Sequence, residues 1–234
     1  RSLKSKMNNN KIYNIAIIGL GNIGSRHLES ILKCDFKINI YIYDSNQNLL
    51  KKNLNKINFY SSKINIIAIK NLKEIPTFLD FCIVATPSTS RLSTILEIKS
   101  SIRFLLLEKI LTSSRKELEI FSKQNKNYES VFVNMPYYYQ DIFQIMKKEI
   151  NKPTEIIFRG NDFGIACNLV HFLQISERFL GRTITNFSQS SKKIQWKAAK
   201  RIGFYDLLGE IKLTLPTGEI IKVLDEEINK PGLI

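Results

Sequence analysis

Cysteine is scarce in this sequence, and the little there is forms no recognisable pattern. Only three of the 234 residues are cysteines, Cys34, Cys82 and Cys167, and they lie far apart along the chain. Zinc sites need cysteine or histidine pairs at short spacing, and disulfide-stabilised folds need a denser and even-numbered set. The count therefore excludes a disulfide framework and a cysteine-based zinc site. We expect a reducing, cytoplasmic setting and no bound metal.

Long apolar runs are also absent from the sequence. A membrane-spanning helix needs roughly 18 to 20 consecutive apolar residues, whereas the apolar runs here, such as Phe104 to Leu107, are only as long as a strand. Residues 1–10 are basic and rich in asparagine but lack the apolar segment of a secretory signal. We therefore expect no membrane partner, and we treat residues 1–10 as a basic tail outside the fold.

Acidic residues are outnumbered by basic ones. The chain has 35 Lys and Arg against 21 Asp and Glu, which gives a formal net charge of +14. A nucleic-acid-binding face requires that such charge be clustered, because clustered cations neutralise neighbouring phosphates. Here the lysines are scattered along the whole chain. The pattern favours a solvated basic surface, no specific nucleic-acid partner, and a mild electrostatic preference for an anionic small substrate.

A glycine-rich turn follows the first apolar segment of the chain. Ile15 to Ile18 is typical of a buried strand, and Gly19, Gly21 and Gly24 then have the G-x-G-x-x-G spacing. In this motif the first glycine permits a tight turn, the second lets the backbone approach a pyrophosphate, and the third allows close helix-strand packing. The free N–H groups at the start of the next helix would bind the pyrophosphate. The predicted phosphate-binding residues are Gly19, Gly21, Asn22, Ile23 and Gly24.

An aspartate ends the second expected strand. Residues 37–44 alternate isoleucine with polar or aromatic residues, and Asp44 lies 20 positions after Gly24. A carboxylate at this position hydrogen-bonds the adenosine ribose hydroxyls of NAD and repels the 2′-phosphate of NADP. Ser45 and Asn46 supply no arginine to compensate, so we predict NAD, with NADP less favoured. The alternative is that Asp44 only caps the helix that begins near Asn46.

Apolar segments alternate with helical patterns up to about residue 134. This alternation predicts an α/β fold with a doubly wound parallel sheet, a Rossmann domain, over residues 11–134. Beyond it, over residues 135–234, helices become fewer and extended segments more frequent. The expected strands are 15–18, 37–44, 64–69, 81–85, 102–107, 131–133, 154–159, 194–197, 206–215 and 220–224. The expected helices are 22–34, 47–56, 71–80, 91–99, 114–126, 136–150 and 164–180, and Gly181 is expected to end the last of them. Residues 188–192 are expected to form a polar connection and residues 215–219 a hairpin turn.

Three short motifs follow one another along the chain. The first is Gly-Leu-Gly-Asn-Ile-Gly-Ser-Arg-His, residues 19–27, the second is Ala85-Thr86-Pro87-Ser88, and the third is Glu108-Lys109-Ile110. In this order they resemble the Gfo/Idh/MocA family of glucose-fructose oxidoreductases and inositol dehydrogenases, although Arg91 stands where that family usually has a histidine and Ile110 replaces its usual proline. The resemblance extends from about Lys11 to about Glu219 and implies an α+β second domain with a largely antiparallel sheet that carries the substrate site.

The resemblance also implies the roles of individual residues. Lys109 corresponds to the lysine beside the nicotinamide and the substrate hydroxyl, where it can help to move the hydroxyl proton as a hydride leaves. His171 corresponds to the histidine that faces the substrate, but Cys167 occupies the position of the aspartate four residues before it. The remaining predicted contacts are Ala85, Thr86, Pro87, Ser88 and Glu108 to the cofactor, and Arg91 and Asn168 to the substrate.

Each of these assignments has a structural alternative. Glu108 and Lys109 could be a solvated strand end, and His171 could be an ordinary helix residue packed among apolar neighbours. Cys167 reads more readily as a small buried residue than as a nucleophile, because no context that would activate its thiol is visible.

The sequence thus predicts an NAD-dependent oxidoreductase that acts on a hydroxyl or keto group of a sugar, polyol or sugar nucleotide. The alternative is a catalytically degenerate paralogue that binds a dinucleotide in a regulatory or structural role, because Cys167 replaces the family aspartate. Relatives commonly continue beyond this length, so we expect the second domain to be incomplete at its C-terminal end. A homo-oligomer is expected if that domain is complete.

Overall fold

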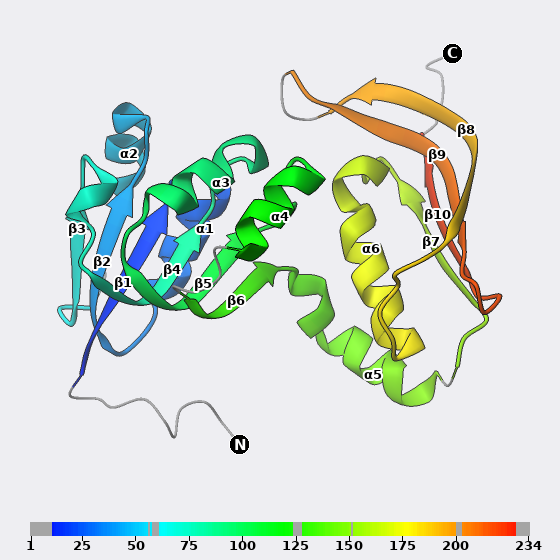
Figure 1. Cartoon of the computed structure of the whole chain (residues 1–234), viewed down its shortest axis with the longest axis horizontal. Coiled ribbons are helices and arrows are strands. Elements are labelled where there is room, and N and C mark those ends of the chain that lie inside the picture. The colour runs from blue at the N-terminus through cyan, green and yellow to red at the C-terminus, as the bar shows by residue number, and fades with distance from the viewer. Residues whose placement is uncertain are drawn as a thin grey trace, which may run out of the picture. The chain divides into compact units, whose positions relative to one another are not determined.

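The computed structural model describes residues 11–55, 57, 61–123, 128–150, 152–199 and 203–227. The chain divides into two compact units between Asn134 and Met135 (Figure 1). The predicted basic tail, residues 1–10, lies outside the described residues, as do the ends expected for the helices 47–56 and 114–126.

The first unit is built on a six-stranded parallel sheet with the strand order β3-β2-β1-β4-β5-β6 (Figure 1). The chain adds strands outward from β1 to β3 and then returns to the other side of β1 with β4, so the strand order reverses between β1 and β4. The doubly wound parallel sheet predicted from the sequence is confirmed. Its strands are β1 Ile12–Ile18, β2 Lys37–Tyr43, β3 Ile64–Ala68, β4 Phe78–Val84, β5 Ser101–Glu108 and β6 Tyr128–Asn134.

Helices cover both faces of this sheet. Neighbouring residues of β1 enter different clusters, because Ile17 packs with Leu28 and Leu50 on one face while Ile18 packs with Leu92 and Phe121 on the other. This is the period of two expected of a strand that is buried on both faces. The first face is covered by α1 (Asn22–Ile31) and α2 (Gln47–Leu54), and the second by α3 (Ser88–Glu97) and α4 (Arg115–Lys123).

The prediction of a helix at 71–80 is wrong. Only Leu72–Glu74 forms a short 3-10 turn, which Asn71 caps, and β4 begins at Phe78. Phe78 pairs with Ser101 of β5, and Leu79 is fully buried in the sheet. The physical reason is that Pro76 ends helical hydrogen bonding, after which pairing with β5 stabilises the extended form.

The second unit has a four-stranded sheet with the order β7-β10-β9-β8, and α6 packs on one face of it (Figure 1). β7 and β10 run parallel and the other pairs are antiparallel, so the largely antiparallel sheet is confirmed with one parallel pair. The core lies between α6 and the sheet, where Ile165 meets Ile211, Ile221 and Val223. The elements are α5 Asp141–Glu149, β7 Glu155–Asn161, α6 Ile165–Leu180, β8 Ser188–Ala198, β9 Tyr205–Thr214 and β10 Ile220–Glu226.

Two expectations for the second unit need correction. The polar connection predicted at 188–192 is the first half of β8, because its backbone pairs with residues 210–214 of β9 while its side chains stay exposed. The single helix predicted at 136–150 is a 3-10 turn, Pro136–Tyr139, followed by α5; the extended backbone of Gln140 (φ −68°, ψ 138°) separates them. Gly181 ends α6 in the left-handed conformation (φ 69°), as predicted.

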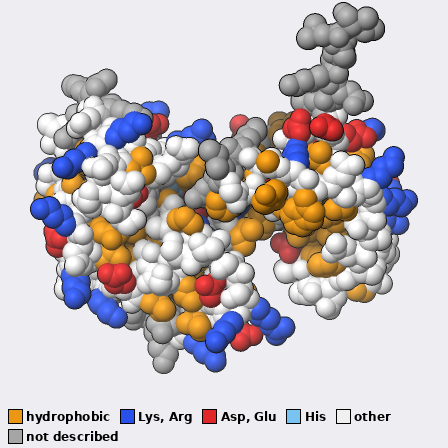
Figure 2. Space-filling view, turned by 90° about the horizontal axis from the view of Figure 1, so that it is seen from above, with side chains coloured by type: hydrophobic (Ala, Val, Ile, Leu, Met, Phe, Trp, Pro, Cys, Tyr) orange, Lys and Arg blue, Asp and Glu red, His pale blue; other side chains and the backbone are white. Residues whose placement is uncertain are grey.

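Three further features concern the surface charge, the length of the helices and the grouping of side chains that could bind a metal. On the face drawn in Figure 2, Lys and Arg side chains are spread over both units and do not gather into one patch. Within the described residues, no helix is long and apolar enough to cross a bilayer. In the same part of the chain, no group of three or more His, Cys, Asp or Glu side chains could hold a metal ion.

Candidate active site

The glycine-rich turn joins the carboxyl end of β1 to α1, and close packing requires two of its glycines. Gly19 has a φ of 90°, and a Cβ there would lie 3.0 Å from the carbonyl carbon of Ala85. A Cβ on Gly24 would lie 1.8 Å from the carbonyl oxygen of Gly19. No side chain fits at either position. These two glycines therefore bring α1 and the end of β4 against the turn.

Gly21 differs, because the space beside it is open. It is the N-cap of α1, and no side chain among the described residues caps this helix end. A Cβ on Gly21 would meet no heavy atom of the described chain within 4 Å, its chain neighbours aside. The hydroxyl of Thr86, whose backbone lies against Gly19, is buried and has no hydrogen-bond partner in the described part of the structure. An uncapped helix N-terminus, an open cradle and an orphaned hydroxyl fit a bound diphosphate.

Asp44 lies just beyond β2, beside this turn, and is 8% exposed. Its Oδ2 accepts a hydrogen bond from the Leu20 N–H at 2.6 Å, and its Oδ1 accepts one from the Asn46 N–H at 2.8 Å. The cap of α2 is Asn46, whose own side chain accepts from the first turn of the helix. Asp44 therefore shapes the glycine-rich turn rather than capping α2. Each carboxylate oxygen keeps a lone pair for a further donor such as a ribose hydroxyl.

The Glu108 carboxylate accepts two hydrogen bonds at the carboxyl end of β5. His27 Nε2 lies 2.8 Å and Asn134 Nδ2 lies 2.7 Å from Glu108 Oε1. Burial raises the pKa of Glu108, but the two hydrogen bonds and the positive charges of His27 and Arg91 outweigh it, so the pKa lies below its ordinary value of 4.5. The side chain is only 12% exposed. Glu108 is therefore not a solvated strand end but an ionised group held by α1 and β6.

Arg91, on α3, is 2% exposed, and its guanidinium faces backbone carbonyls. Nη1 donates to Glu108 O at 2.6 Å, to Ile110 O, and to Leu111 O at 3.3 Å, and Nη2 donates to Thr86 O. Burial lowers the pKa of Arg91, and the negative charge of Glu108 opposes that shift. The side chain predicted to contact substrate is thus directed toward the chain's own loops. Lys109 lies between two of these carbonyls and is half-buried.

The predicted substrate residues of the second unit lie on α6. His171 is 5% exposed and meets Tyr137 edge to face, with ring centroids 4.7 Å apart. Asn168 Nδ2 donates to Phe163 O at 2.6 Å, so its amide stabilises the start of the helix. Cys167, expected to be buried, is exposed. Cys167 lies in the first turn of α6 and does not belong to the core cluster that this helix forms with the sheet.

Two buried aspartates that the sequence analysis missed support the start of α6. Asp225 Oδ2 accepts from the Gly164 N–H at 2.7 Å, and Asp206 Oδ1 accepts from the Ala166 N–H at 2.8 Å. They stabilise the positive end of the helix dipole from β10 and β9. His27 and Asn134 were likewise not predicted as partners of Glu108. Their only signal was position, since His27 closes the glycine motif and Asn134 ends the sixth strand.

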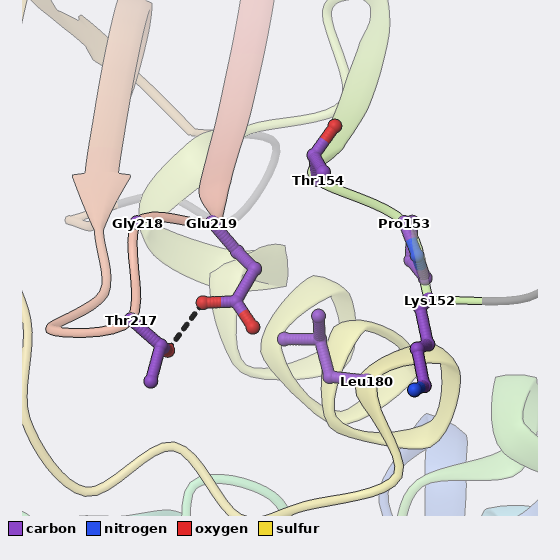
Figure 3. A pocket seen from close by; sticks show the side chains of 7 residues that line it. All are labelled: Lys152, Pro153, Thr154, Leu180, Thr217, Gly218 and Glu219. Atoms are coloured by element: carbon purple, nitrogen blue, oxygen red, sulfur yellow. Dashed lines mark hydrogen bonds between the residues drawn. The ribbon is translucent and has the colours of Figure 1, made fainter.

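A cavity of about 490 Å³ lies elsewhere in the second unit. Figure 3 shows it between the C-terminal end of α6, at Leu180, and the turn that joins β9 to β10, where Thr217 and Glu219 are hydrogen-bonded to each other. Neither His171 nor Asn168 lines it. The cavity is therefore distinct from the residues predicted to contact substrate.

Comparison with known proteins identifies the fold. No protein-family profile and no curated protein match the sequence. Solved structures do: myo-inositol 2-dehydrogenase from Lactobacillus plantarum has a TM-score of 0.67 and 18% identity over 93% of this chain and 71% of that chain. The UDP-N-acetylglucosamine 3-dehydrogenase GnnA from Acidithiobacillus ferrooxidans has a TM-score of 0.64 and 10% identity over 93% and 71%.

A third similar structure is myo-inositol dehydrogenase from Lactobacillus casei, solved in complex with NAD(H) and myo-inositol. It has a TM-score of 0.67 and 14% identity over 93% of this chain and 68% of that chain. The chain therefore has the fold of the Gfo/Idh/MocA-type dehydrogenases, as its three motifs predict.

Proposed function

We propose that this chain is a nicotinamide-dinucleotide-dependent oxidoreductase that acts on a hydroxyl or keto group of a sugar, polyol or sugar nucleotide. The observation that carries the proposal is the open, uncapped start of α1 at Gly21. The start of α1 follows the carboxyl end of β1, and Glu108 and Lys109 lie at the carboxyl end of β5. Because β1 and β5 are parallel strands of one sheet, these groups lie along the same side of it. In open α/β sheets, ligands bind at this edge where the strand order reverses.

The residues assigned to the cofactor divide into three groups. The first turn of α1 would bind the diphosphate through Gly21, Asn22, Ile23 and Gly24, and the loop of Ala85, Thr86, Pro87 and Ser88 would lie along the dinucleotide. Asp44 would accept hydrogen bonds from the adenosine ribose hydroxyls. A second phosphate on that ribose would meet a carboxylate already fixed by two backbone amides, so we propose NAD rather than NADP.

The chemistry requires a proton to move at the substrate while hydride moves to or from the cofactor. The bound nicotinamide supplies the hydride chemistry. Lys109 would hold the proton of the reacting hydroxyl on its amine, and the Glu108 carboxylate, fixed by His27 and Asn134, would keep the charge balance beside it. His171 and Asn168 of the second unit are proposed as substrate contacts.

Titration with NADH and with NADPH, followed by nucleotide fluorescence, tests the cofactor assignment. We expect NADH to bind at least about tenfold more tightly than NADPH. Binding of neither nucleotide would overturn the proposal.

Turnover tests the catalytic assignment. The Lys109→Ala variant should keep its NADH affinity but lose about 10²-fold or more of substrate-dependent NADH formation across a panel of sugars, polyols and sugar nucleotides. Lys116→Ala, at an exposed position of α4, is the matched control and should behave as the wild type.

A non-catalytic dinucleotide-binding role is the second candidate, and it is favoured by Cys167, which stands where the resembled family has an aspartate. It predicts that NADH binds and that no member of the panel is turned over. In that case Cys167→Asp, which restores a carboxylate at this position, distinguishes a lost activity from a substrate missing from the panel.

A further inference from the structure

The guanidinium of Arg91 forms hydrogen bonds with two different segments of the first unit. Its Nη1 donates to the carbonyls of Glu108 and Ile110, the residues on either side of Lys109. The backbone of the proposed catalytic lysine is therefore fixed from both sides by one nitrogen. Leu111 O, at 3.3 Å, extends the contact along the same segment.

The other terminal nitrogen of the same guanidinium reaches a different loop. Nη2 donates to Thr86 O, in the loop that follows β4. Because the guanidinium is planar and rigid, the positions of its two nitrogens fix the Thr86 carbonyl relative to the Glu108 and Ile110 carbonyls. Arg91 thus holds the loop proposed to line the cofactor in a fixed position relative to the segment that carries Lys109.

A buried positive charge costs free energy unless its donors are satisfied. Among the contacts of Arg91 in the described residues, carbonyl oxygens accept from both terminal nitrogens, whereas the buried Nε has no partner there. Lysine would present a single nitrogen, and the histidine usual in the resembled family has a shorter side chain with two ring nitrogens. Neither can reproduce a fork that spans both loops.

We propose that Arg91 is a positioning residue for Lys109, and not a substrate contact. It sets the backbone of residues 108–111 relative to the Thr86 loop, so that the Lys109 amine is held where the cofactor and substrate meet. This inference rests on the proposed function for its catalytic meaning. The hydrogen bonds from Arg91 to the carbonyls of Thr86, Glu108 and Ile110, which we call the clamp, can be tested without turnover.

The test compares Arg91→Met and Arg91→Lys with Arg103→Met in the whole 234-residue chain. Arg103 is a matched control, because it lies on β5 with a 47% exposed side chain that pairs with Glu129. The first readout is native-state cleavage by trypsin after Lys109, measured by mass spectrometry, with cleavage after Lys116 and Lys123 of α4 as the internal reference. The second readout is kcat against the NADH Kd.

Loss of the clamp should accelerate cleavage after Lys109 by about tenfold or more in both Arg91 variants, while cleavage in α4 changes by less than about twofold. With a substrate in hand, kcat should fall by about tenfold or more while the NADH Kd changes by less than about fivefold. Arg103→Met should change neither readout.

Unchanged cleavage after Lys109, or an equal rise at all three lysines, would overturn the positioning role. If Arg91→Met fails to fold, Arg91→Lys carries the same test, since it keeps the charge and loses the fork. A wild-type protein that binds no dinucleotide overturns the proposed function, whereas the cleavage result still decides whether Arg91 holds the Lys109 segment.

Discussion

His27 Nε2 and Glu108 Oε1 lie 2.8 Å apart, although 81 positions separate the two residues in the chain. The contact joins the helix that follows the glycine-rich turn to the strand that precedes Lys109. With Asn134 bound to the same oxygen, it connects three elements of the first unit at the sheet edge where we place the dinucleotide.

Replacing Glu108 with glutamine should lower stability in a pH-dependent way. The folded-state pKa of Glu108 lies below 4.5, so the ionised carboxylate stabilises the fold above about pH 4.5 and this contribution is lost as pH falls through the lower folded value. At pH 7 we expect Glu108→Gln to cost about 1–2 kcal/mol in urea unfolding.

The difference between wild type and Glu108→Gln should shrink toward zero as the pH is lowered below about 4.5. Glu129→Gln, at an exposed position of β6, is the control and should cost less than about 0.5 kcal/mol. A difference that stays constant down to pH 3 would contradict the ionised, hydrogen-bonded state of Glu108.

The two glycines of the turn should respond differently to alanine. A Cβ at position 24 would overlap the Gly19 carbonyl at 1.8 Å, so Gly24→Ala must displace α1 and should cost about 3 kcal/mol or more. Gly21→Ala adds its Cβ to open space and should cost no more than about 1 kcal/mol. Thermal unfolding of both variants measures the contrast, and equal losses would refute it.

The start of α6 should depend on Asp225. The aspartate is 1% exposed and accepts hydrogen bonds from the Phe163 and Gly164 amides, so Asp225→Asn should destabilise the second unit by about 1–3 kcal/mol. The neighbouring Glu226 pairs with Arg159 at the surface, and Glu226→Gln should cost less than about 1 kcal/mol. Chemical denaturation of both variants compares the two; a larger loss in Glu226→Gln would be inconsistent with the capping role.

The three cysteines should react at very different rates with a thiol reagent. Burial raises the pKa of the Cys82 thiol to about 12, and the side chain is fully buried, so almost no thiolate is available at neutral pH. Cys167 is exposed and Cys34 is partly exposed. In the native protein we expect Cys167 to be modified first and Cys82 only after unfolding. Peptide mapping after partial modification checks the order, and early modification of Cys82 would contradict it.

Much of the first unit could be predicted because its sequence signals are local. The apolar strands, the glycine spacing and Asp44 fix the order of β1, α1 and β2 without knowledge of the rest of the chain. The signal failed where local preference and sheet pairing disagree. Phe78 to Asp80 continues a helical pattern, yet the backbone of this segment pairs with β5.

The second unit was less predictable, because there too backbone pairing and not local sequence preference decides which segments are strands. The polar residues 188–192 give no strand signal, because their place in β8 comes from backbone pairing with β9 and not from burial. In the site, residue types were predictable but partners were not. Arg91 follows the Thr86 loop in sequence, and nothing in the sequence indicates that its guanidinium reaches the carbonyls on both sides of Lys109.

The affinity of the wild-type protein and of Gly21→Ala for NADH is the most direct test of the proposed dinucleotide site. Because the variant should fold normally, a change in its affinity reports on the open space above the start of α1. We predict that the wild type binds NADH and that Gly21→Ala weakens binding by about tenfold or more. No binding by the wild type, or equal binding by both proteins, would contradict the site.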